Sequence, residues 1–383
     1  MKDGPSVMII GLDPTPATSE KMGDLTSRLL EQSEFLRNLF HICRSKKEIA
    51  PIRLSENLTT YPVSPPFRAL YSHYAFKTAS EIIKRNKVDV VYTQDPFFCG
   101  RAGLKIKKKF KIPVIMGMHA DILDNPFWLK ESPHYRLLNL WGKHQIKKAD
   151  LVRAVSHTIK ENLVGLGVPE GRIITVPTGG GVDVKKFSKA DGTMIRERYG
   201  GSDIILFVGR LAKQKNLALL LDVAERTARE RQSARFLIAG DGPERGHIES
   251  LAKKRRISNV EFLGRVPFDE LPEYYAASDV VALPSNYEGL PKTVEEAFAS
   301  GKPVVSTAVS GSTELVMDGK TGYLVGIRDS QAFSERLLTL LSDKALASRM
   351  GSAGRDLVAK SYDRRKNLKK MYSELYERGA ASR

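Results

Sequence analysis

Short apolar runs return at regular intervals along this chain, and each is followed by a longer stretch with helical periodicity. The runs are rich in Val and Ile, lack polar alternation, and are bounded by Gly, Pro or polar residues. Strands that are covered on both faces show this pattern. We therefore predict strands over Val7–Gly11, Val88–Thr93, Pro113–Met118, Leu151–Ser156, Ile173–Pro177, Ile204–Gly209, Arg235–Gly240, Val260–Leu263, Val280–Leu283 and Pro303–Thr307.

Helix candidates such as Leu217–Glu230 and Glu244–Arg256 lie between the runs. This alternation predicts an α/β fold with parallel, doubly wound sheets. A glycine-rich and then polar segment at 179–188 separates two sets of strands, which is typical of a domain linker. We predict two facing Rossmann-like domains with a cleft between them, at 1–187 and 188–361. The last helix, about 362–383, is able to pack back on the first domain.

The composition excludes several classes of protein. No apolar run approaches the roughly 18–20 residues of a membrane span, and Val7–Leu12 is too short for a signal sequence. The two cysteines, Cys43 and Cys99, cannot build a disulfide framework or a Cys-based metal site. We expect a cytoplasmic protein without a metal or other cofactor. A peripheral position on the inner face of the membrane stays open.

The positive charge is unevenly distributed. The net charge is +17, and residues 1–189 hold 30 Lys+Arg against 18 Asp+Glu, a balance of +12. Such a basic half indicates an anionic partner: a phosphate-bearing ligand, an acidic membrane surface or nucleic acid. Aromatic residues are not interleaved with the basic ones at 101–111 beyond Phe110, which argues against nucleic acid. The cluster is equally compatible with a solvated helix face. It consists of Arg101, Lys105, Lys107, Lys108, Lys109 and Lys111.

The segment Ser285–Val305 is the strongest candidate for a ligand site. In open α/β sheets ligands bind beyond the carboxyl ends of the strands, and this segment follows a predicted strand. Glu288 lies in its loop, and Glu296 follows on a predicted helix with seven residues between them. The helix N-terminus favours an anion. This order suits a sugar nucleotide, which has hydroxyls at both ends and a diphosphate between them. The plain alternative is an ordinary turn followed by solvated acids, a role that suits Glu295 better than Glu296.

Two further strand ends carry side chains that suit the same ligand. Arg210 and Lys215 follow the first strand of the second domain, where fixed cations can stabilise a departing diphosphate. His119 follows a strand of the first domain and can donate to a sugar hydroxyl or a phosphate. A structural role is the alternative for each.

Two glycine-containing loops carry weaker signals. The loop from Gly11 to Asp24 includes Gly23, where a backbone could approach a ligand closely. The loop from Gly240 to Gly246 is similar to a dinucleotide fingerprint, and Glu261 lies about 20 residues on. Its glycine spacing is wrong and it contains Pro243, so we expect a loop that lines the cleft instead.

These motifs resemble those of the family-4 retaining glycosyltransferases, which have the GT-B fold. The specific part is the run from Ser285 to Thr307, with its two spaced acids. Gly-Arg-Leu-x-x-x-Lys-Asn at 209–216, Gly-Asp-Gly-Pro-Glu at 240–244 and Gly-Val-Asp-x-x-x-Phe at 181–187 agree with it. The family often has a Gly-Gly pair in the first loop, where this chain has Met22-Gly23. This chain also has Gly180 at a position where the family usually has Asn.

The resemblance implies a role for each candidate residue. Arg210 and Lys215 would bind the diphosphate, Glu288 and His119 the donor sugar, and Glu296 the ribose. The remaining donor-binding candidates are backbone or base contacts. They are Gly23, Gly240, Arg265, Val266, Gly289, Leu290 and Pro291.

We therefore predict a retaining, metal-independent transfer of a hexose from a UDP- or GDP-linked donor to a hydroxyl of a glycan or lipid-linked acceptor. The first domain would hold the acceptor and the second the donor. A sugar-nucleotide 2-epimerase of the same fold, and a non-catalytic nucleotide-sugar-binding protein, stay open as alternatives. The sequence does not reveal the sugar, the base, the acceptor or the oligomeric state.

Overall fold

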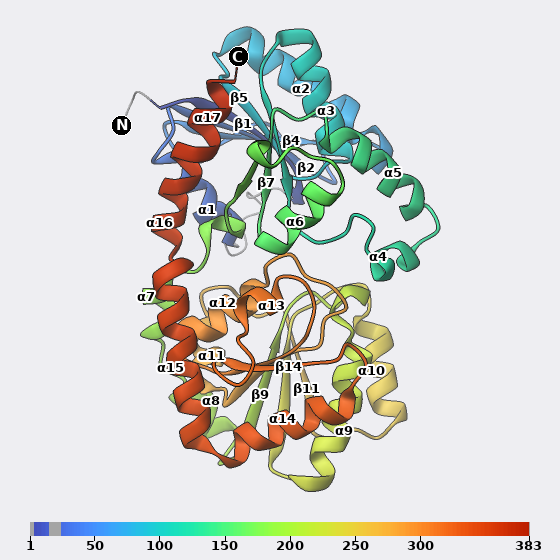
Figure 1. The fold of residues 1–383 in the computed structure, drawn as a ribbon, viewed down its shortest axis with the longest axis vertical. Helices are drawn as coiled ribbons and strands as arrows, with labels where there is room; N and C mark the ends of the chain where they lie inside the picture. Colours follow the sequence, from blue (N-terminus) through green and yellow to red (C-terminus); the bar gives the residue numbers. More distant parts are fainter. Residues whose placement is uncertain (1–3, 15–23, 383) are drawn as a thin grey trace. The chain divides into compact units, whose positions relative to one another are not determined.

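A computed structural model describes residues 4–14 and 24–382 of the chain. Contacts within the chain divide it into two compact units, whose elements are labelled in Figure 1. Unit 1 takes in the described residues up to Asp124, then Ser132–Gly179 and the chain from Lys366 on. Unit 2 consists of Asn125–Glu131 and Gly180–Arg365. Each unit therefore contains a segment that is distant in sequence from the rest of it.

Unit 1 is built on an eight-stranded sheet in the order β3-β4-β2-β1-β5-β6-β7-β8. All neighbouring strands are parallel except β3 and β4, which are antiparallel. In the centre of the sheet, Ile9 lies opposite His41 on one side and Tyr92 on the other. The strands are β1 Ser6–Pro14, β2 Asn38–Arg44, β3 Ile52–Arg53, β4 Leu58–Val63, β5 Val90–Thr93, β6 Val114–Met118, β7 Leu151–Ala154 and β8 Ile173–Thr175.

Helices cover this sheet, and the end of the chain contributes to its core. Leu368, Met371, Leu375 and Tyr376 are buried against strand residues of unit 1. The helical elements are α1 Asp24–Ser33, η1 Arg68–Leu70, α2 Tyr71–Arg85, α3 Phe98–Phe110, α5 Tyr135–Ile146, α6 His157–Gly165, η2 Glu170–Arg172, η3 Thr178–Gly180, α16 Arg364–Lys370, a π-helical stretch Met371–Glu377 and α17 Arg378–Ala380.

Unit 2 is built on a six-stranded sheet in the order β11-β10-β9-β12-β13-β14, with every neighbouring pair parallel. The strands are β9 Asp203–Val208, β10 Ala234–Ala239, β11 Val260–Gly264, β12 Val280–Leu283, β13 Val304–Thr307 and β14 Gly322–Val325. The order reverses direction between β9 and β12, and ligands of open α/β sheets bind at such switch points.

Apolar faces of the helices of unit 2 pack on this sheet, with Phe207, Phe236 and Phe333 among the largest fully buried side chains. The helical elements are α4 Pro126–Glu131, α7 Val184–Ser188, α8 Thr193–Arg198, η4 Lys213–Lys215, α9 Leu217–Glu230, α10 Arg245–Lys254, α11 Leu271–Ala277, α12 Lys292–Ala299, α13 Ser312–Leu315, α14 Ser330–Ser342 and α15 Lys344–Ser361.

The predicted fold class of two doubly wound, parallel α/β units is confirmed, and all ten predicted strands are present within a few residues of their expected ends. Four strands were not predicted: β2, β3, β4 and β14. Strand β2 contains His41, and β4 alternates buried and half-buried residues. Neither is the continuous apolar run on which the prediction rested. Within the described residues, no helix combines the length and apolar character that a membrane crossing requires.

Candidate functional site

The loop between β12 and α12 is held at the carboxyl edge of the unit 2 sheet by side-chain and backbone hydrogen bonds. Thr307, at the end of β13, donates to the carbonyl of Ser285 at 2.6 Å. The backbone N–H of Asn286 donates to the carbonyl of Gln214 at 2.8 Å, and the Gln214 amide donates to the carbonyl of Tyr287 at 2.9 Å. The loop after β12 and the loop after β9 are therefore fixed to each other.

Glu288 lies at the centre of this arrangement, with 5% of its surface exposed. Its Oε1 accepts from the Lys215 ammonium at 2.5 Å and from the Ser285 hydroxyl at 2.6 Å. Its Oε2 accepts a longer bond of 3.4 Å from Gln214. A buried carboxylate is costly unless charged and polar partners surround it, and these three donors supply them. They also fix the orientation of the carboxylate.

Glu296 lies in the second turn of α12 and is also buried, with 7% exposure. The hydroxyl of Tyr275, on α11, donates to its Oε2 at 2.8 Å. Burial, and then the Glu296 carboxylate, raise the pKa of Tyr275 well above its ordinary value. Tyr275 therefore stays a neutral donor that orients Glu296.

The expected plain role for Glu295, a solvated helix residue, is wrong. Its side chain is fully buried, and Thr293, Val294 and the rest of α12 to Ala299 are buried as well. Every residue of α12 from Thr293 to Ala299 is buried, so this part of the helix has no solvated face. Burial, and then the carboxylates of Glu314 and Glu295, raise the pKa of Tyr362, which places Glu295 near α15.

The first turn of α12 lies next to the loop that carries the predicted cations. The Thr293 hydroxyl donates to the carbonyl of Val208, the last residue of β9, at 3.0 Å. Gly209 and Arg210 follow directly, and Arg210 is exposed to solvent. The sequence therefore brings Arg210, Lys215 and the α12 N-terminus to one edge of unit 2.

Glycine allows the neighbouring loops to pack closely at this edge. A Cβ at Gly240 would lie 1.9 Å from the carbonyl oxygen of Gly209, and the Gly240 N–H donates to Gly264 at 2.7 Å. Arg265 and Val266 follow Gly264, so they too are at this edge, with Arg265 exposed. Glu261, the acid that completes the dinucleotide-like spacing, instead pairs with Arg198 at 2.9 Å on the surface.

The backbone at Gly289, Leu290 and Pro291 is buried where the loop enters α12. Gly311, before α13, has φ of +51°, and a Cβ there would lie 2.2 Å from the carbonyl oxygen of Gly289. The close approach of these two glycines sets the path of the loop. Tyr287 adds a bond of 2.8 Å to Glu131 of α4, which belongs to the same unit.

His119 belongs to unit 1, where it directly follows β6 and is half-buried. Its Nε2 lies 2.9 Å from the hydroxyl of Tyr92, which also accepts from the buried Arg153 at 3.3 Å. Burial, then the charges of Arg153 and Arg28, lower the pKa of His119 to about 3. The imidazole is therefore neutral at physiological pH. Gly117 leaves the room for this pair, since a Cβ there would lie 2.3 Å from the Tyr92 oxygen.

Of the predicted site residues, Gly23 lies outside the described part of the chain.

Sequence reasoning missed the partners that orient the acids and the histidine: Gln214, Ser285, Tyr275, Tyr92 and Arg153. Gln214 and Ser285 lie inside the motifs already singled out, so their position was the available signal. Nothing in the sequence pattern linked Tyr275 to Glu296, because the two residues come from different helices.

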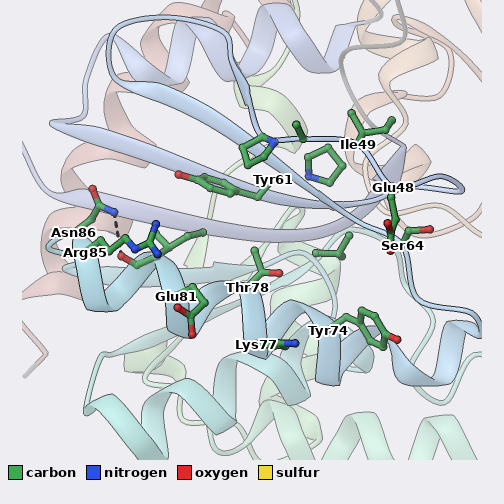
Figure 2. Close-up of a pocket in the computed structure, with 15 residues that line it drawn as sticks. Glu48, Ile49, Tyr61, Ser64, Tyr74, Lys77, Thr78, Glu81, Arg85 and Asn86 are labelled. Atoms are coloured by element: carbon green, nitrogen blue, oxygen red, sulfur yellow. Dashed lines mark hydrogen bonds between the residues drawn. The ribbon is translucent and has the colours of Figure 1, made fainter.

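Unit 1 also contains a hollow of about 700 Å³ that none of the predicted site residues lines. It lies between α2 and the chain segments at Glu48–Pro51 and Tyr61–Ser64, and Lys77, Glu81 and Arg85 are among its lining residues (Figure 2). Among the described residues, no three His, Cys, Asp or Glu side chains are grouped so that they could hold a metal ion.

Solved structures with the same fold define the class of this protein. Sucrose-phosphate synthase from Thermosynechococcus elongatus superposes with a TM-score of 0.85 at 21% identity, over 99% of this chain and 100% of the other. Anabaena HepE in complex with UDP-glucose superposes with a TM-score of 0.76 at 19% identity, over 97% and 99%. With its two parallel-sheet α/β units, the chain has the GT-B fold of these enzymes.

Sequence similarity then gives the family. Residues 39–185 match the family described as Glycosyltransferase Family 4, and residues 194–357 match Glycosyl transferases group 1. Alpha-D-kanosaminyltransferase from Streptomyces kanamyceticus is 33% identical over 66% of this chain and 67% of its own length. A GDP-mannose-dependent alpha-mannosyltransferase from Mycobacterium tuberculosis is 28% identical over 80% and 76%. The chain belongs to the family-4 glycosyltransferases, as its motifs indicated.

Proposed function

We propose that this protein transfers a hexose, with retention of configuration, from a UDP- or GDP-linked donor to a hydroxyl of a glycan or lipid-linked acceptor. The observation that carries the proposal is the buried Glu288, fixed by Lys215 and Ser285 beside the N-terminus of α12. Such a site offers acceptors for sugar hydroxyls and donors for phosphates within one loop.

The diphosphate is assigned to Arg210, Lys215 and the first turn of α12. The Lys215 ammonium has three donors, and its bond to Glu288 uses one of them. Arg210 is exposed and offers a planar fork for phosphate oxygens. The unpaired N–H groups of a helix N-terminus add a partial positive charge. Together these groups would stabilise the charge that builds on the departing nucleoside diphosphate, and the proposal needs no metal.

Glu288 is assigned to the hydroxyls of the donor sugar. Its Oε1 already accepts two hydrogen bonds, so the carboxylate suits the binding of further hydroxyls better than nucleophilic attack. Glu296, oriented by Tyr275, is assigned to the ribose, and the backbone at Gly289–Pro291 to the sugar and phosphate. Arg265 and Val266 are assigned to the base, and Gly240 to the loop beside it.

His119 is assigned to the donor sugar as a neutral hydrogen-bonding group. Its lowered pKa of about 3 keeps the imidazole uncharged at neutral pH. With Nε2 bonded to Tyr92, Nδ1 is left as the nitrogen for a sugar hydroxyl. Gly23, outside the described residues, is assigned to the donor on the resemblance alone.

The proposed reaction is a same-face substitution. The bond between the anomeric carbon and the diphosphate oxygen breaks, and a bond from that carbon to the acceptor oxygen forms on the same face. The acceptor hydroxyl gives its proton to the departing phosphate, so the products are the glycoside and the nucleoside diphosphate. The protein contributes orientation and charge stabilisation. Two similar proteins support UDP or GDP as the leaving nucleoside diphosphate. One relative is named as GDP-mannose-dependent, and one solved structure is a complex with UDP-glucose.

A panel of UDP- and GDP-linked sugars, each incubated with and without candidate hydroxyl acceptors, tests the proposal. We expect slow release of nucleoside diphosphate from one donor alone and faster release with an acceptor. Conversion of a donor to its 2-epimer without an acceptor would support the epimerase alternative. Donor binding without either reaction over the full panel would support a non-catalytic binding protein.

A further inference from the structure

Helix α5 of unit 1 departs in part from the usual polarity of a surface helix, although Ile146 at its end is buried. Its buried face carries the polar residues Asn139 and Gln145, while Leu137 and Leu140 on the other face are 72% and 62% exposed. Asn139 bonds to Asp124, and Gln145 donates to the carbonyl of Pro96 at 2.7 Å, so the buried amides are satisfied. A surface helix normally buries its leucines. The exposed pair is therefore unlike an ordinary solvated face.

A second exposed apolar group lies before and at the start of α2. Phe67 is 71% exposed, Leu70 41% and Tyr74 37%. They follow Pro65 and Pro66 at the short helix η1. Single exposed apolar residues are common, whereas neighbouring groups of them mark interaction surfaces.

Helix α3 lies between these two groups and joins them through cation–aromatic contacts. Helices α2, α3 and α5 pack side by side in this order (Figure 1). The Arg68 guanidinium lies 5.9 Å from the Phe98 ring, which meets the Trp141 ring edge-on at 5.6 Å, and Arg101 lies 5.7 Å from Trp141. Residue 137 is one turn before Trp141 on the same side of α5. The leucines, the Phe67 segment and the α3 cations are thus neighbours.

The charged side chains of η1, α3 and α5 themselves all have one sign, although Asp124 pairs with Lys143 of α5. Lys105 and Lys109 lie 5.8 and 5.7 Å from the Phe76 ring of α2, and Arg101 and Lys108 are exposed on α3. None of η1, α3 and α5 contains an Asp or Glu. These elements therefore lack acidic side chains that could pair with basic residues of a protein partner. Long cationic side chains over aromatic rings keep their stems on apolar surface and their charges in the polar layer.

We propose that the α3 face, defined as Phe67, Leu70, Arg101, Lys109, Leu137 and Leu140, docks on an anionic lipid bilayer. Apolar side chains next to Lys and Arg are the composition of interfacial membrane-binding surfaces. Each Lys or Arg near an anionic surface contributes about 1 kcal/mol, and the leucines add burial in the headgroup layer. The basic cluster expected from the sequence supplies the charge; the exposed leucines and Phe67 distinguish the face from a solvated one. The inference rests on no residue of the donor site and stands or falls independently of transfer.

Co-sedimentation of the full chain with vesicles tests this proposal. The probes are vesicles of phosphatidylcholine alone and vesicles with phosphatidylglycerol as a third of the lipid, at low and at 0.5 M salt. We expect binding to the anionic vesicles only, and a marked loss at high salt because screening shortens the range of the attraction.

Two variants separate the charge from the apolar contribution. Replacing Arg101 and Lys109 with Gln removes two cations, and at about 1 kcal/mol each we expect a roughly thirtyfold weaker binding. Leu137→Gln with Leu140→Gln removes two exposed apolar side chains. We expect at least tenfold weaker binding, and the size of this loss should not depend on the salt concentration. The control is Lys77→Gln with Arg85→Gln, which removes the same charge from the hollow beside α2 (Figure 2). Its binding should stay within about threefold of wild type.

Three outcomes would overturn the proposal. One is equal binding to neutral and anionic vesicles. Another is an equal loss in the control and in the Arg101/Lys109 variant, which would indicate net charge and not this face. The third is a concentration-dependent dimer in sedimentation velocity, without vesicle binding, that the Leu137/Leu140 variant converts to monomer. That result would assign the face to a second copy of the chain. Release of nucleoside diphosphate with a water-soluble acceptor should be unchanged in all three variants.

Discussion

At the scale of single residues, the buried ion pair of Glu288 and Lys215 is the centre of the candidate site. Buried pairs stabilise a fold only weakly, because desolvation offsets their attraction. A pair of this kind at a strand end therefore indicates a functional constraint more than a structural one. Ser285 and Gln214 complete its surroundings and hold the carboxylate in one orientation.

A different residue predicts how stability depends on pH. His41, in the centre of β2, is fully buried, and neither of its ring nitrogens has a hydrogen-bond partner within the described structure. Burial lowers the pKa of His41 to about 4. The folded state therefore binds fewer protons than the unfolded state, in which the pKa is near 6.5. The stability contribution is complete above pH 6.5 and is lost as the pH falls toward 4.

We expect His41 alone to lower the free energy of unfolding by about 2 kcal/mol between pH 8 and pH 5. His41→Leu, which has a similar volume, should reduce the acid-dependent loss by that amount. Urea unfolding of wild type and variant at both pH values checks this. Parallel pH profiles for the two proteins would contradict it.

At the scale of elements, loops at one sheet edge position the site. The β9, β10, β11 and β12 loops meet through glycines at 240 and 264 and through the bond from Thr293 to Val208. Apolar runs in the sequence predicted these strands well, since strands covered on both faces need apolar side chains at every position. Strand β4, which lies between the short edge strand β3 and β2, has half-buried positions that lack that requirement, so its pattern was not recognised.

The approach of Gly311 to Gly289 gives a prediction for the loop before α12. Gly311→Ala places a Cβ 2.2 Å from the Gly289 oxygen at φ +51°, so the loop must shift. We expect a loss of more than about 2 kcal/mol in unfolding free energy and weaker donor binding. Gly319→Ala has a similar φ of +72° but no neighbour within 4 Å, and should lower stability by about 1 kcal/mol while donor binding is unchanged. Equal effects in the two variants would show that backbone strain alone matters.

Predictability was uneven within the candidate site as well. Arg210 with Lys215, and Glu288 with Glu296, form two short motifs that each follow a predicted strand, so the sequence located both pairs without a structure. The buried state of Glu295 and the link between Tyr275 and Glu296 depend on how α11, α12 and α15 pack. Contacts between distant helices leave no periodic signal in either segment.

At the scale of the whole molecule, the chain builds two units and returns to the first with its last residues. Leu368, Met371 and Leu375 fill the core of unit 1 from the C-terminal end. Unit 1 is therefore not a contiguous segment of sequence, and its stability depends on the last helical stretch. Unit 1 also contains the α3 face, and most of the excess positive charge lies in the first half of the chain.

Leu375→Ala tests this dependence. Leu375 is fully buried, and we expect a loss of about 2–5 kcal/mol that is confined to unit 1. Hydrogen exchange should quicken in β1 and β5 and stay unchanged in β9 and β12. Lys370→Ala, at an exposed position five residues earlier in the same helical stretch, is the control and should leave both units unchanged. Equal quickening in both sheets would contradict the assignment of the last helix to unit 1.

The central claim is that the Glu288 loop serves sugar transfer, and acceptor-dependent release of nucleoside diphosphate by Glu288→Gln measures it most directly. Gln keeps the size of the side chain and one acceptor oxygen, replaces the other oxygen with a donor NH2 group, and removes the charge beside Lys215. Glu261→Gln is the matched control, because it removes a carboxylate of the same unit that pairs with Arg198 on the surface. We predict at least a hundredfold loss of release in Glu288→Gln and wild-type release in Glu261→Gln. Wild-type release in Glu288→Gln would contradict the claim.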